Sequence, residues 1–488
     1  MADILLTHSF LLRFDPKQFR TGQAYAPLGT LYAAAMLRKT GISFELYDPM
    51  FAESPEALVP VLRREKPKIL VIYDDGFNYL SKMCLGNMKD SACRMIRAGK
   101  EQGATVVICS VDANDHAPFY LDQGADYCIL GEGEQTLAEL SEALAGMTRQ
   151  QIPDIPGVSW KAPGGVRNSR PREVITRLDD LPFPAWDLLD MDRYRRFWKR
   201  KNGSFTLNLV TTRGCPYGCI WCAKPVYGNH YNARSPENVA AELKLLTENY
   251  HPDRIWFADD IFGLKPGWIE EYAAKVRPEN LVLPYTIQSR VDLLQDDRTV
   301  ASLAASGCNK VWLGIESGSQ KILDAMRKGT TVEQAEAASV KLKEAGIRQA
   351  FFLQLGFPGE TREDIDRTIR LITRLLPDDI GISVTYPLPG TPFFEAVKSQ
   401  MKEKMSWSDS NDLSLLYRSS FSPAFYRYLH RYIHKYYRFR QAMFYLRSFP
   451  GKRTSPEKGR IRRILLMPYY YLFSVFYQFL VKRAEHAG

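Results

Sequence analysis

Two runs in which short apolar segments alternate with helical patterns constrain the fold of this 488-residue chain most strongly. The first run covers residues 1–145, where five segments have the length and β-branched content of buried strands: ADILLTHS, SFELYDP, KILVIYD, ATVVICS and ADYCILG. Helical patterns such as LGTLYAAAMLRKTG and EQTLAELSEALAG separate them. Because strands that alternate with helices form parallel sheets covered on both faces, we predict a doubly wound α/β domain in residues 1–145.

Small or polar residues follow most of these predicted strands directly. They are Ser9, Asp74, Asp75, Ser110 and Gly131. In an open parallel sheet, ligands bind at the carboxyl ends of the strands, so these residues are candidates for ligand binding. No G-x-G-x-x-G sequence follows the first strand, which gives a dinucleotide site little support.

A second run of alternating patterns follows a segment rich in proline, glycine and charge. This segment, residues 146–203, is predicted to be a linker with one hairpin. The predicted strands beyond it are SFTLNLVTT, RIWFADD, LPYTIQSR, KVWLGIES, QAFFLQLG and IGISVTYP. Six such βα units in residues 204–400 indicate a full or partial parallel barrel, with its active site at the C-terminal ends of the strands.

Three of the eight cysteines, Cys215, Cys219 and Cys222, lie in the loop after the first strand of this second run. So few cysteines in so long a chain do not make a disulfide framework, and their clustering favours metal or redox chemistry. A structural zinc site needs four closed ligands, and His230 is the only further candidate nearby, so zinc is disfavoured. Three thiolates on a four-iron cluster leave one iron open to a small-molecule ligand.

The other five cysteines are scattered and have apolar neighbours, which is typical of buried structural thiols. They are Cys84, Cys93, Cys109, Cys128 and Cys308. We assign them no function.

The C-x3-C-x2-C spacing, with the aromatic Trp221 just before the last cysteine, resembles the signature of radical S-adenosylmethionine (radical SAM) enzymes. The resemblance implies that Cys215, Cys219 and Cys222 bind a [4Fe-4S] cluster whose open iron is chelated by S-adenosylmethionine. An electron from the cluster then cleaves this molecule to methionine and a 5'-deoxyadenosyl radical. The backbone around Trp221 would face the adenine. Similar segments extend over residues 204–395.

Polar or small residues at the other strand ends match contacts that the resemblance implies. They are Asp259, Asp260, Gln288, Arg290, Glu316, Ser317 and Gly356. Asp259 and Asp260 would accept hydrogen bonds from an ammonium or a ribose hydroxyl, with helix capping as the alternative. Arg290, which follows Gln288 by two positions, would bind the methionine carboxylate, and Glu316 with Ser317 would contact the methionine or ribose part. Glycine at 356 would let the backbone approach the adenine.

The first domain, which ends in GADYCILGEGEQTLAEL, resembles the cobalamin-binding domain of cobalamin-dependent radical SAM enzymes. That group includes the anaerobic magnesium-protoporphyrin ester cyclase and hopanoid methylases. The resemblance implies cobalamin between the carboxyl edge of the first sheet and the mouth of the barrel. The D-x-H-x-x-G sequence that supplies a cobalt-binding histidine is absent, and Asp112 and His116 in DANDHAPF are spaced differently. We therefore expect His116 to be a loop residue and cobalamin to bind without a histidine.

Residues 401–488 form a basic, aromatic-rich region that is predicted to be helical. From Leu413 onward there are 15 Lys and Arg against 2 Asp and Glu, whereas the preceding residues carry 50 against 53. This composition fits a helical subdomain on the barrel, a membrane surface or nucleic acid, and nucleic acid is the least favoured. Residues 464–481 carry no charge, but four tyrosines and Pro468 make them a poor membrane-spanning helix.

These features favour a cobalamin-dependent radical SAM enzyme that modifies an unactivated carbon, with methylation of a hydrophobic or natural-product molecule as the preferred reaction. A lipid-like substrate is an alternative, and flavodoxin or ferredoxin is the expected electron donor. The N-terminus has no basic segment followed by a long apolar one, so no secretion signal is predicted. A cytoplasmic location is expected, with peripheral contact to the inner face of the membrane as an alternative.

Three other functions stay open. A ring-forming radical SAM enzyme shares every motif named above. An RNA methylthiotransferase shares the cysteine motif, but it usually carries three further cluster cysteines in the N-terminal domain, and the scattered cysteines do not form such a set. A non-catalytic cobalamin or redox sensor would not need the cluster ligands together with polar groups at every strand end.

Overall fold

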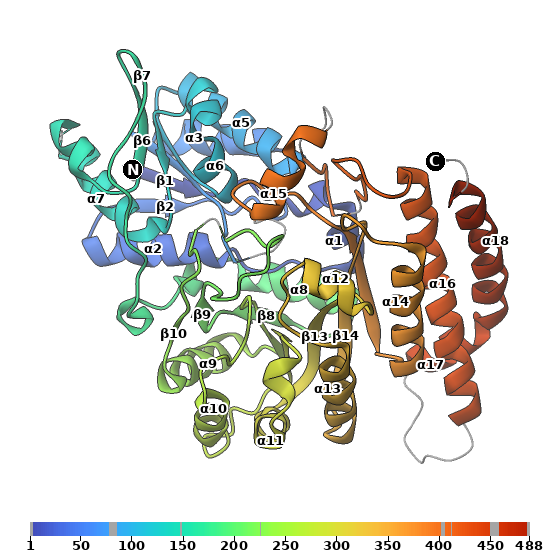
Figure 1. The fold of residues 1–488 in the computed structure, drawn as a ribbon. Coiled ribbons are helices and arrows are strands. Elements are labelled where there is room, and N and C mark those ends of the chain that lie inside the picture. The colour runs from blue at the N-terminus through green and yellow to red at the C-terminus, as the bar shows by residue number, and fades with distance from the viewer. Residues whose placement is uncertain are drawn as a thin grey trace.

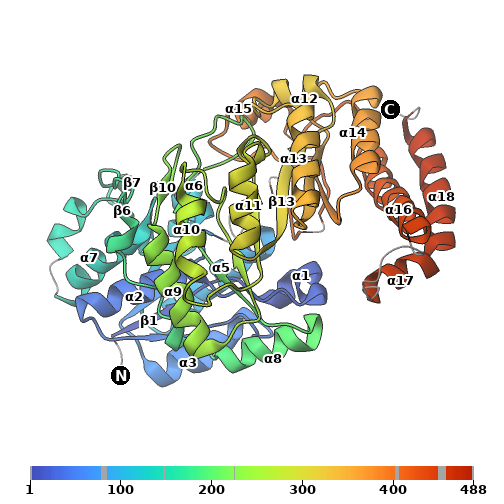
Figure 2. The same cartoon turned by 90° about the horizontal axis from the view of Figure 1, so that it is seen from below.

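The chain folds into two α/β units and a C-terminal group of helices, which lies farthest from the N-terminal sheet (Figures 1 and 2). The structure is a computed structural model, and it describes residues 3–77, 85–146, 149–224, 226–401, 406–410, 412–448 and 458–485. Cys84, predicted to be a structural thiol, lies outside these ranges. Cys93, Cys109, Cys128 and Cys308 are buried free thiols, as predicted.

The first unit is a seven-stranded sheet in the order β2-β1-β3-β4-β5-β6-β7. Its five parallel strands are β1 (Ile4–Thr7), β2 (Phe44–Leu46), β3 (Ile69–Tyr73), β4 (Thr105–Cys109) and β5 (Tyr127–Ile129). Each lies within one of the predicted segments. Alternate residues of the central strands point to opposite faces, and both faces are covered by helices.

The helices on the first sheet fall into two groups. On one face lie α2 (Leu28–Thr40) and α7 (Gly133–Ala145), and on the other α3 (Leu58–Glu65), α5 (Gly86–Glu101) and α6 (Val111–Asp122). This is the doubly wound arrangement that the sequence predicts. Each helix packs its apolar side against one face of the sheet.

A hairpin, β6 (Val158–Ala162) and β7 (Gly165–Asn168), extends this sheet beyond β5. It is the hairpin predicted within residues 146–203. The two-residue connection between β6 and β7 permits only antiparallel pairing, and β6 also pairs antiparallel with β5. The sheet predicted for residues 1–145 is parallel, as expected, and the hairpin adds two antiparallel strands to its edge, so the segment expected as a linker contributes to the sheet.

The second unit is a six-stranded parallel sheet whose strands follow one another in chain order. They are β8 (Thr206–Leu209), β11 (Arg254–Phe257), β12 (Tyr285–Ser289), β13 (Cys308–Glu316), β14 (Arg348–Leu355) and β15 (Asp379–Val384). Within the described residues β8 and β15 each pair with one strand of this sheet, so the barrel is partial. The helices between the strands are α9 (Pro236–Tyr250), α10 (Trp268–Val276), α11 (Asp297–Ala305), α12 (Gln320–Ala325), α13 (Val332–Glu344) and α14 (Arg362–Leu375).

The first unit covers the free edge of β8. Asn208 on β8 exchanges two hydrogen bonds with the backbone of Ala26, at 2.9 and 2.8 Å. Trp198 donates from its indole nitrogen to the carbonyl of Ala24 at 2.6 Å. These contacts join the two units at an edge that would otherwise present unpaired backbone groups.

The remaining helices and 3-10 turns lie between the elements named above or after β15. They are the helices α1 (Pro16–Thr21), α8 (Met191–Asn202) and α15 (Pro392–Val397) and 3-10 turns at Leu12–Phe14, Pro55–Ala57, Arg149–Asp154, Leu178–Asp180, Trp186–Leu188, Asp292–Leu294 and Lys398–Gln400.

The C-terminal region is helical, as predicted, and consists of α16 (Pro423–Ser448), α17 (Lys458–Leu465) and α18 (Met467–Glu485). Helix α16 packs on α14 and β15, and α18 packs on α16. Gln441 donates to the carbonyl of Pro377 at 2.7 Å, and Arg438 pairs with Asp379 at 2.6 Å. This part of the tail is therefore a subdomain packed on the barrel.

Candidate active site

The three cysteines lie on one loop at the carboxyl end of β8. Its ends are joined by the short antiparallel strands β9 (Thr212–Arg213) and β10 (Asn232–Ala233). Cys215 is buried, whereas Cys219 and Cys222 are half-buried. Burial raises the pKa of Cys215. The loop thus presents three thiols at the end of the sheet where parallel barrels carry their active sites.

Asp259 fixes the start of this loop. One carboxylate oxygen accepts the backbone N–H groups of Thr211 at 2.7 Å and Thr212 at 2.9 Å. The other accepts the hydroxyl of Thr211 at 2.6 Å. Burial raises the pKa of Asp259 to about 6 despite these hydrogen bonds. Both oxygens are used within the protein, so Asp259 positions the cysteine loop; its predicted contact with a cofactor stays a prediction.

A buried ion pair lies beside the cysteine loop. Lys328 donates to Glu316 at 2.9 Å, and Gln354 donates to the other carboxylate oxygen of Glu316 at 3.0 Å. The Lys328 nitrogen lies 5.9 Å from the centre of the Trp221 ring. Burial alone would lower the pKa of Lys328, but Glu316 and then Cys219 raise it above its usual value. A charged ammonium and a carboxylate therefore lie together next to the thiols.

Arg290 is engaged within the protein and is not an open clamp. Its guanidinium pairs with Asp292 at 2.9 Å and donates to the carbonyl of Lys328 at 2.9 Å. Its centre lies 3.6 Å from the ring centre of Tyr217, which belongs to the cysteine loop. Arg290 thus supports that loop and the turn of Lys328. Direct binding of a carboxylate, the role predicted for it, gains no support from these contacts.

Ser317 and Gly356 also contact the protein in ways the sequence did not predict. The Ser317 hydroxyl lies 3.2 Å from that of Thr368, and it accepts the N–H of Ser319 at 3.1 Å. Gly356 has a positive φ of 87°, and a Cβ there would meet Leu415 at 3.1 Å. Its glycine is therefore explained by close packing of the C-terminal region; approach to an adenine stays a prediction.

Two buried polar atoms near the ion pair have no hydrogen-bond partner among the described residues. They are the indole nitrogen of Trp221 and the side-chain oxygen of Gln354. Gln288 is half-buried on β12, and Asp260 is exposed at the end of β11. Buried polar atoms normally have hydrogen-bond partners, so the unpartnered atoms of Trp221 and Gln354 mark this region as a place for a polar ligand.

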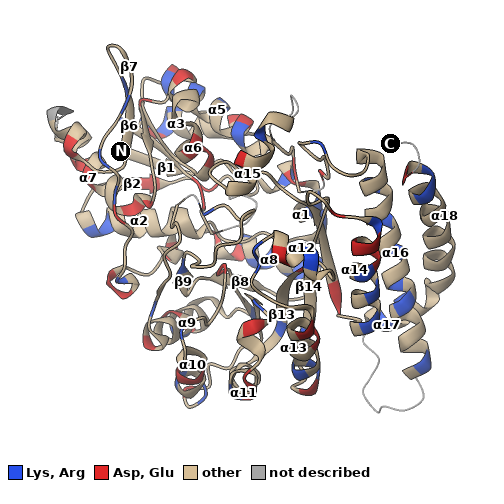
Figure 3. Ribbon diagram, viewed as in Figure 1, with Lys and Arg blue, Asp and Glu red and all other residues tan. Residues whose placement is uncertain are grey.

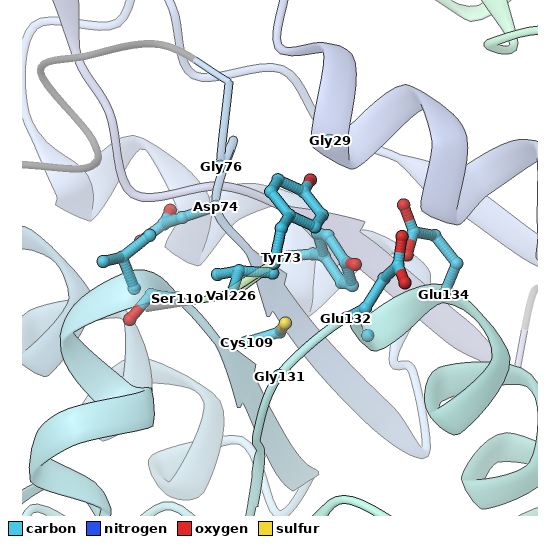
Figure 4. A pocket seen from close by; sticks show the side chains of 13 residues that line it. Gly29, Tyr73, Asp74, Gly76, Cys109, Ser110, Gly131, Glu132, Glu134 and Val226 are labelled. Carbon is cyan, nitrogen blue, oxygen red and sulfur yellow. The ribbon is translucent and has the colours of Figure 1, made fainter. Parts of the chain in front are cut away.

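A cavity lies at the carboxyl edge of the first sheet (Figure 4). Three of the five residues predicted there line it: Asp74, Ser110 and Gly131. Ser9 is close by and donates to Asp74 through its backbone at 2.6 Å and its hydroxyl at 2.8 Å. Asp75 is absent from the lining and accepts the N–H of Gly29 at 3.0 Å. Burial raises the pKa of Asp74.

The cysteine loop closes this cavity from the other side. Val226 and Tyr227, which follow the last cysteine, complete its lining. Tyr227 stacks on Phe77 with 5.8 Å between ring centres. A neighbouring cavity is lined by Gly76 and Val111 of the first unit together with residues of the second, including Asp260. The two predicted sites are therefore brought together at one junction.

Sequence reasoning missed the buried ion triad at this junction. Arg213, two residues before Cys215, pairs with Glu132 and, at 2.8 Å, with Glu134. All three side chains are buried. Burial and Glu134 raise the pKa of Glu132 against the lowering effect of Arg213. The sequence does place a charged residue next to a glycine at both strand ends, Arg213 in TTRGC and Glu132 with Glu134 in GEGE, and this pattern could have indicated the triad.

His116 lies within α6, at a residue with non-helical dihedral angles, and not in a loop as predicted. Its Nδ1 is 3.1 Å from Asp112, which raises its pKa. His116 is absent from the lining of the cavity at the sheet edge. His116 therefore bonds to Asp112 of the same helix and does not lie where a cobalt ligand would be needed.

Parts of the sequence are similar to those of known proteins. Residues 209–372 match the model of the radical SAM superfamily. An uncharacterized methyltransferase of Pyrococcus horikoshii is 34% identical over 284 residues, which are 58% of this chain and 60% of the relative. The anaerobic magnesium-protoporphyrin IX monomethyl ester cyclase of Rubrivivax gelatinosus is 26% identical over 57% of this chain and 50% of its own length. The chain thus spans about half to three fifths of these curated relatives.

Two solved structures share the fold over most of the chain. The cobalamin-dependent S-adenosylmethionine radical enzyme OxsB superposes with a TM-score of 0.75 at 16% identity, covering 98% of this chain and 72% of OxsB. The radical S-adenosylmethionine methyltransferase TsrM from Kitasatospora setae gives 0.67 at 20% identity, covering 82% and 75%. Residues 209–372 are therefore a radical SAM domain, and the chain has the fold of the cobalamin-dependent radical SAM enzymes.

Proposed function

We propose that the protein is a cobalamin-dependent radical SAM enzyme that methylates an unactivated carbon of a small hydrophobic molecule. The observation that carries this proposal is the junction itself. The three cysteine thiols and a buried Lys328–Glu316 pair lie on one side of it, and the carboxyl edge of the first sheet lies on the other.

The donor set fits a [4Fe-4S] cluster. In the described ranges no group of three His, Cys, Asp or Glu side chains converges as around a single metal ion. A cluster does not require this convergence, because each thiolate binds a different iron. Cys215, Cys219 and Cys222 would hold it, and Asp259 with Arg290 would fix the loop around it. Such a cluster supplies the electron that cleaves S-adenosylmethionine.

The ion pair fits the amino-acid end of S-adenosylmethionine. A zwitterion needs a cation for its carboxylate and an anion for its ammonium, and Lys328 and Glu316 supply one of each beside the thiols. The unpartnered atoms of Trp221 and Gln354 can take further hydrogen bonds there. Because the site is buried, such charge-assisted hydrogen bonds are strong.

The edge of the first sheet fits part of a cobalamin. Gly76, Gly131 and Ser110 leave room along the strand ends, and a Cβ added at Gly131 would meet no atom within 4 Å. No histidine is among the described residues that line this cavity. Ser110 and Gly131 at this edge, with Val226 and Tyr227 towards the cysteine loop, would hold the cofactor, which would supply the methyl group. An electron donor of the flavodoxin or ferredoxin kind would reduce the metal centres.

Ring formation is the second candidate, because one relative is a magnesium-protoporphyrin ester cyclase. The two candidates share the cluster and the cleavage of S-adenosylmethionine. They differ in the product, since methylation adds one carbon to the substrate and ring closure does not.

The test is anaerobic reconstitution followed by iron, sulfide and cobalamin analysis. We expect four irons per chain, one cobalamin and release of 5'-deoxyadenosine from S-adenosylmethionine after reduction. The triple variant Cys215→Ala, Cys219→Ala, Cys222→Ala should lose the irons, whereas Cys93→Ala, which removes a thiol in the first unit, should keep them. Four irons in the triple variant would reject the assignment.

A further inference from the structure

Large apolar side chains are exposed together on the outer side of the C-terminal helices. Of the 15 large hydrophobic residues that are exposed in the described chain, 11 lie between Phe444 and Phe479. Leu465, Leu472 and Phe479 are 75%, 65% and 62% exposed. Scattered exposed apolar residues are normal, but a continuous group of this kind marks a contact surface.

These residues form one face of the helices. Leu472, Phe476 and Phe479 follow one another at intervals of four and three residues, which places them on one side of α18. Leu465 is the last residue of α17, which is bent by 60° from α18. The opposite side of α18 is buried against α16 through residues such as Val481. We call Ile461, Leu465, Leu472, Phe476 and Phe479 the outer face; α18 is the outermost helix of the molecule (Figures 1 and 2).

Basic residues border the outer face at both ends. Arg460 and Arg462 are exposed on α17, and Lys482 and Arg483 are exposed at the end of α18. Figure 3 shows positive charge on all three C-terminal helices. In the described residues from 413 to 485 the one acidic side chain is Glu485, and it pairs with Arg362 of α14 at 3.3 Å. An apolar centre between cationic ends is complementary to the acyl chains and anionic headgroups of a membrane surface.

The packing of α18 sets its orientation relative to such a surface. Lys435 of α16 donates to the hydroxyl of Tyr469 at 2.9 Å, and Arg431 lies 5.7 Å from the ring centre of Tyr477. Charges therefore run along the inner side of α18. No single described helix is long and apolar enough to span a membrane, although residues 459–465 and 467–485, bent by 60°, satisfy length and composition as a pair. A spanning α18 would carry Arg431 and Lys435 into the hydrocarbon region, at high cost.

We propose that the outer face of α17 and α18 docks the protein on the surface of an anionic membrane, with α18 parallel to the surface. Exposed Tyr471 fits the headgroup level, where tyrosine is enriched. No residue of the outer face belongs to the candidate active site. Membrane binding and the proposed enzymatic function can therefore each be present without the other.

The experiment is co-sedimentation of the full chain with vesicles of phosphatidylcholine alone or mixed equally with phosphatidylglycerol. We expect binding to the anionic vesicles that is at least tenfold stronger than to neutral ones and that weakens as salt rises. The variant Leu472→Ser, Phe476→Ser, Phe479→Ser and the variant Arg462→Gln, Lys482→Gln, Arg483→Gln should each lose at least tenfold in binding.

The matched control replaces exposed apolar residues elsewhere, with Phe119→Ser and Val340→Ser, and should bind like the parent. Thermal melting of each variant checks that it is folded. Equal recovery of the parent in the supernatant with both vesicles would overturn the proposal. So would a dimer that the apolar variant abolishes without any lipid binding, or binding to single-stranded RNA that needs only the basic residues.

Orientation is read from Phe476→Trp with brominated lipids. Quenching by bromines near the headgroups supports a helix parallel to the surface. Quenching strongest at the bilayer centre would instead show a spanning helix and reject the proposed orientation.

Discussion

Lys328 is a buried lysine, and two neighbours, Glu316 and Cys219, raise its pKa and so favour its positive charge. Glu316 neutralises it within the fold, and Cys219 places it beside the thiols. Together with Glu316 it provides both signs of charge that an amino-acid ligand needs. Its role is therefore testable apart from the cluster itself.

Lys328→Met should weaken the binding of S-adenosylmethionine at least tenfold while leaving the iron content unchanged. It should also lower stability by about 3 to 5 kcal/mol, because Glu316 stays buried without its partner. Calorimetric titration and iron analysis separate the two effects. Lys321→Met, which removes an exposed lysine on α12, is the control, and an equal loss of affinity there would contradict the role of Lys328.

Arg213 joins the start of the cysteine loop to the first unit through ion pairs with Glu132 and Glu134. Arg213→Met leaves Glu132 and Glu134 buried and unpaired, so we expect a loss of about 3 to 5 kcal/mol in unfolding free energy. Adding Glu132→Gln and Glu134→Gln should restore part of it. Denaturant titration measures both, and an additive loss in the triple variant would show that the three residues do not interact.

Local patterns predicted single residues well and distant contacts poorly. The three cysteines and Trp221 are recognisable because their spacing is itself the signal. The partners of Arg290, Ser317 and Gly356 come from other elements, including a C-terminal leucine far along the chain. No spacing in the sequence encodes such contacts.

At the scale of elements, the α16 helix carries two histidines one turn apart. His430 and His434 have ring centres 4.6 Å apart. Burial lowers the pKa of His430 to about 4 and that of His434 to about 3, with Lys17 and Arg438 among the nearby cations. The folded state therefore prefers both rings neutral.

This preference makes stability depend on pH. Between pH 6.5 and about 4 the unfolded chain binds protons at these histidines and the folded chain does not, so unfolding free energy falls as the pH falls. We expect a loss of about 2 kcal/mol for each histidine between pH 7 and pH 5. In His430→Gln, His434→Gln the difference between the two pH values should shrink accordingly in denaturant titrations; an unchanged difference would assign it to other groups.

The strands of both sheets could be predicted because apolar runs of this length bounded by glycine, proline or charge have few alternatives. The six strands of the second sheet fall on the six predicted segments. The pairing of β6 with β5 could not be predicted, because no sequence pattern encodes which strand the hairpin meets. The residues of β7 are all exposed at the edge of the sheet, so β7 carries no apolar pattern.

At the scale of the whole molecule, the C-terminal region packs on the second sheet and shares its apolar core. Tyr417, Phe425 and Tyr437 belong to the same apolar core as the strands of the second sheet. A chain that ends at Asp412 would expose this core, and we expect it to aggregate or to melt at a much lower temperature than the full chain. Size-exclusion chromatography and thermal melting check this; a stable, monodisperse shortened chain would contradict it.

The arrangement of the two units was predictable only in outline, because the order of strands says nothing about which surfaces meet. Asn208 and Trp198 make the contacts that fix it, and both look like ordinary strand and helix residues in the sequence.

The ion triad also has a consequence for how such chains diverge. Arg213 belongs to one half of the molecule and Glu132 with Glu134 to the other, and none of the three is tolerable in the interior without its counterpart. Recombination that joins the amino-terminal half of one lineage to the carboxyl-terminal half of another would separate them. The two halves are therefore expected to be inherited as a unit, and hybrids made between relatives should survive only where both sides of the triad match.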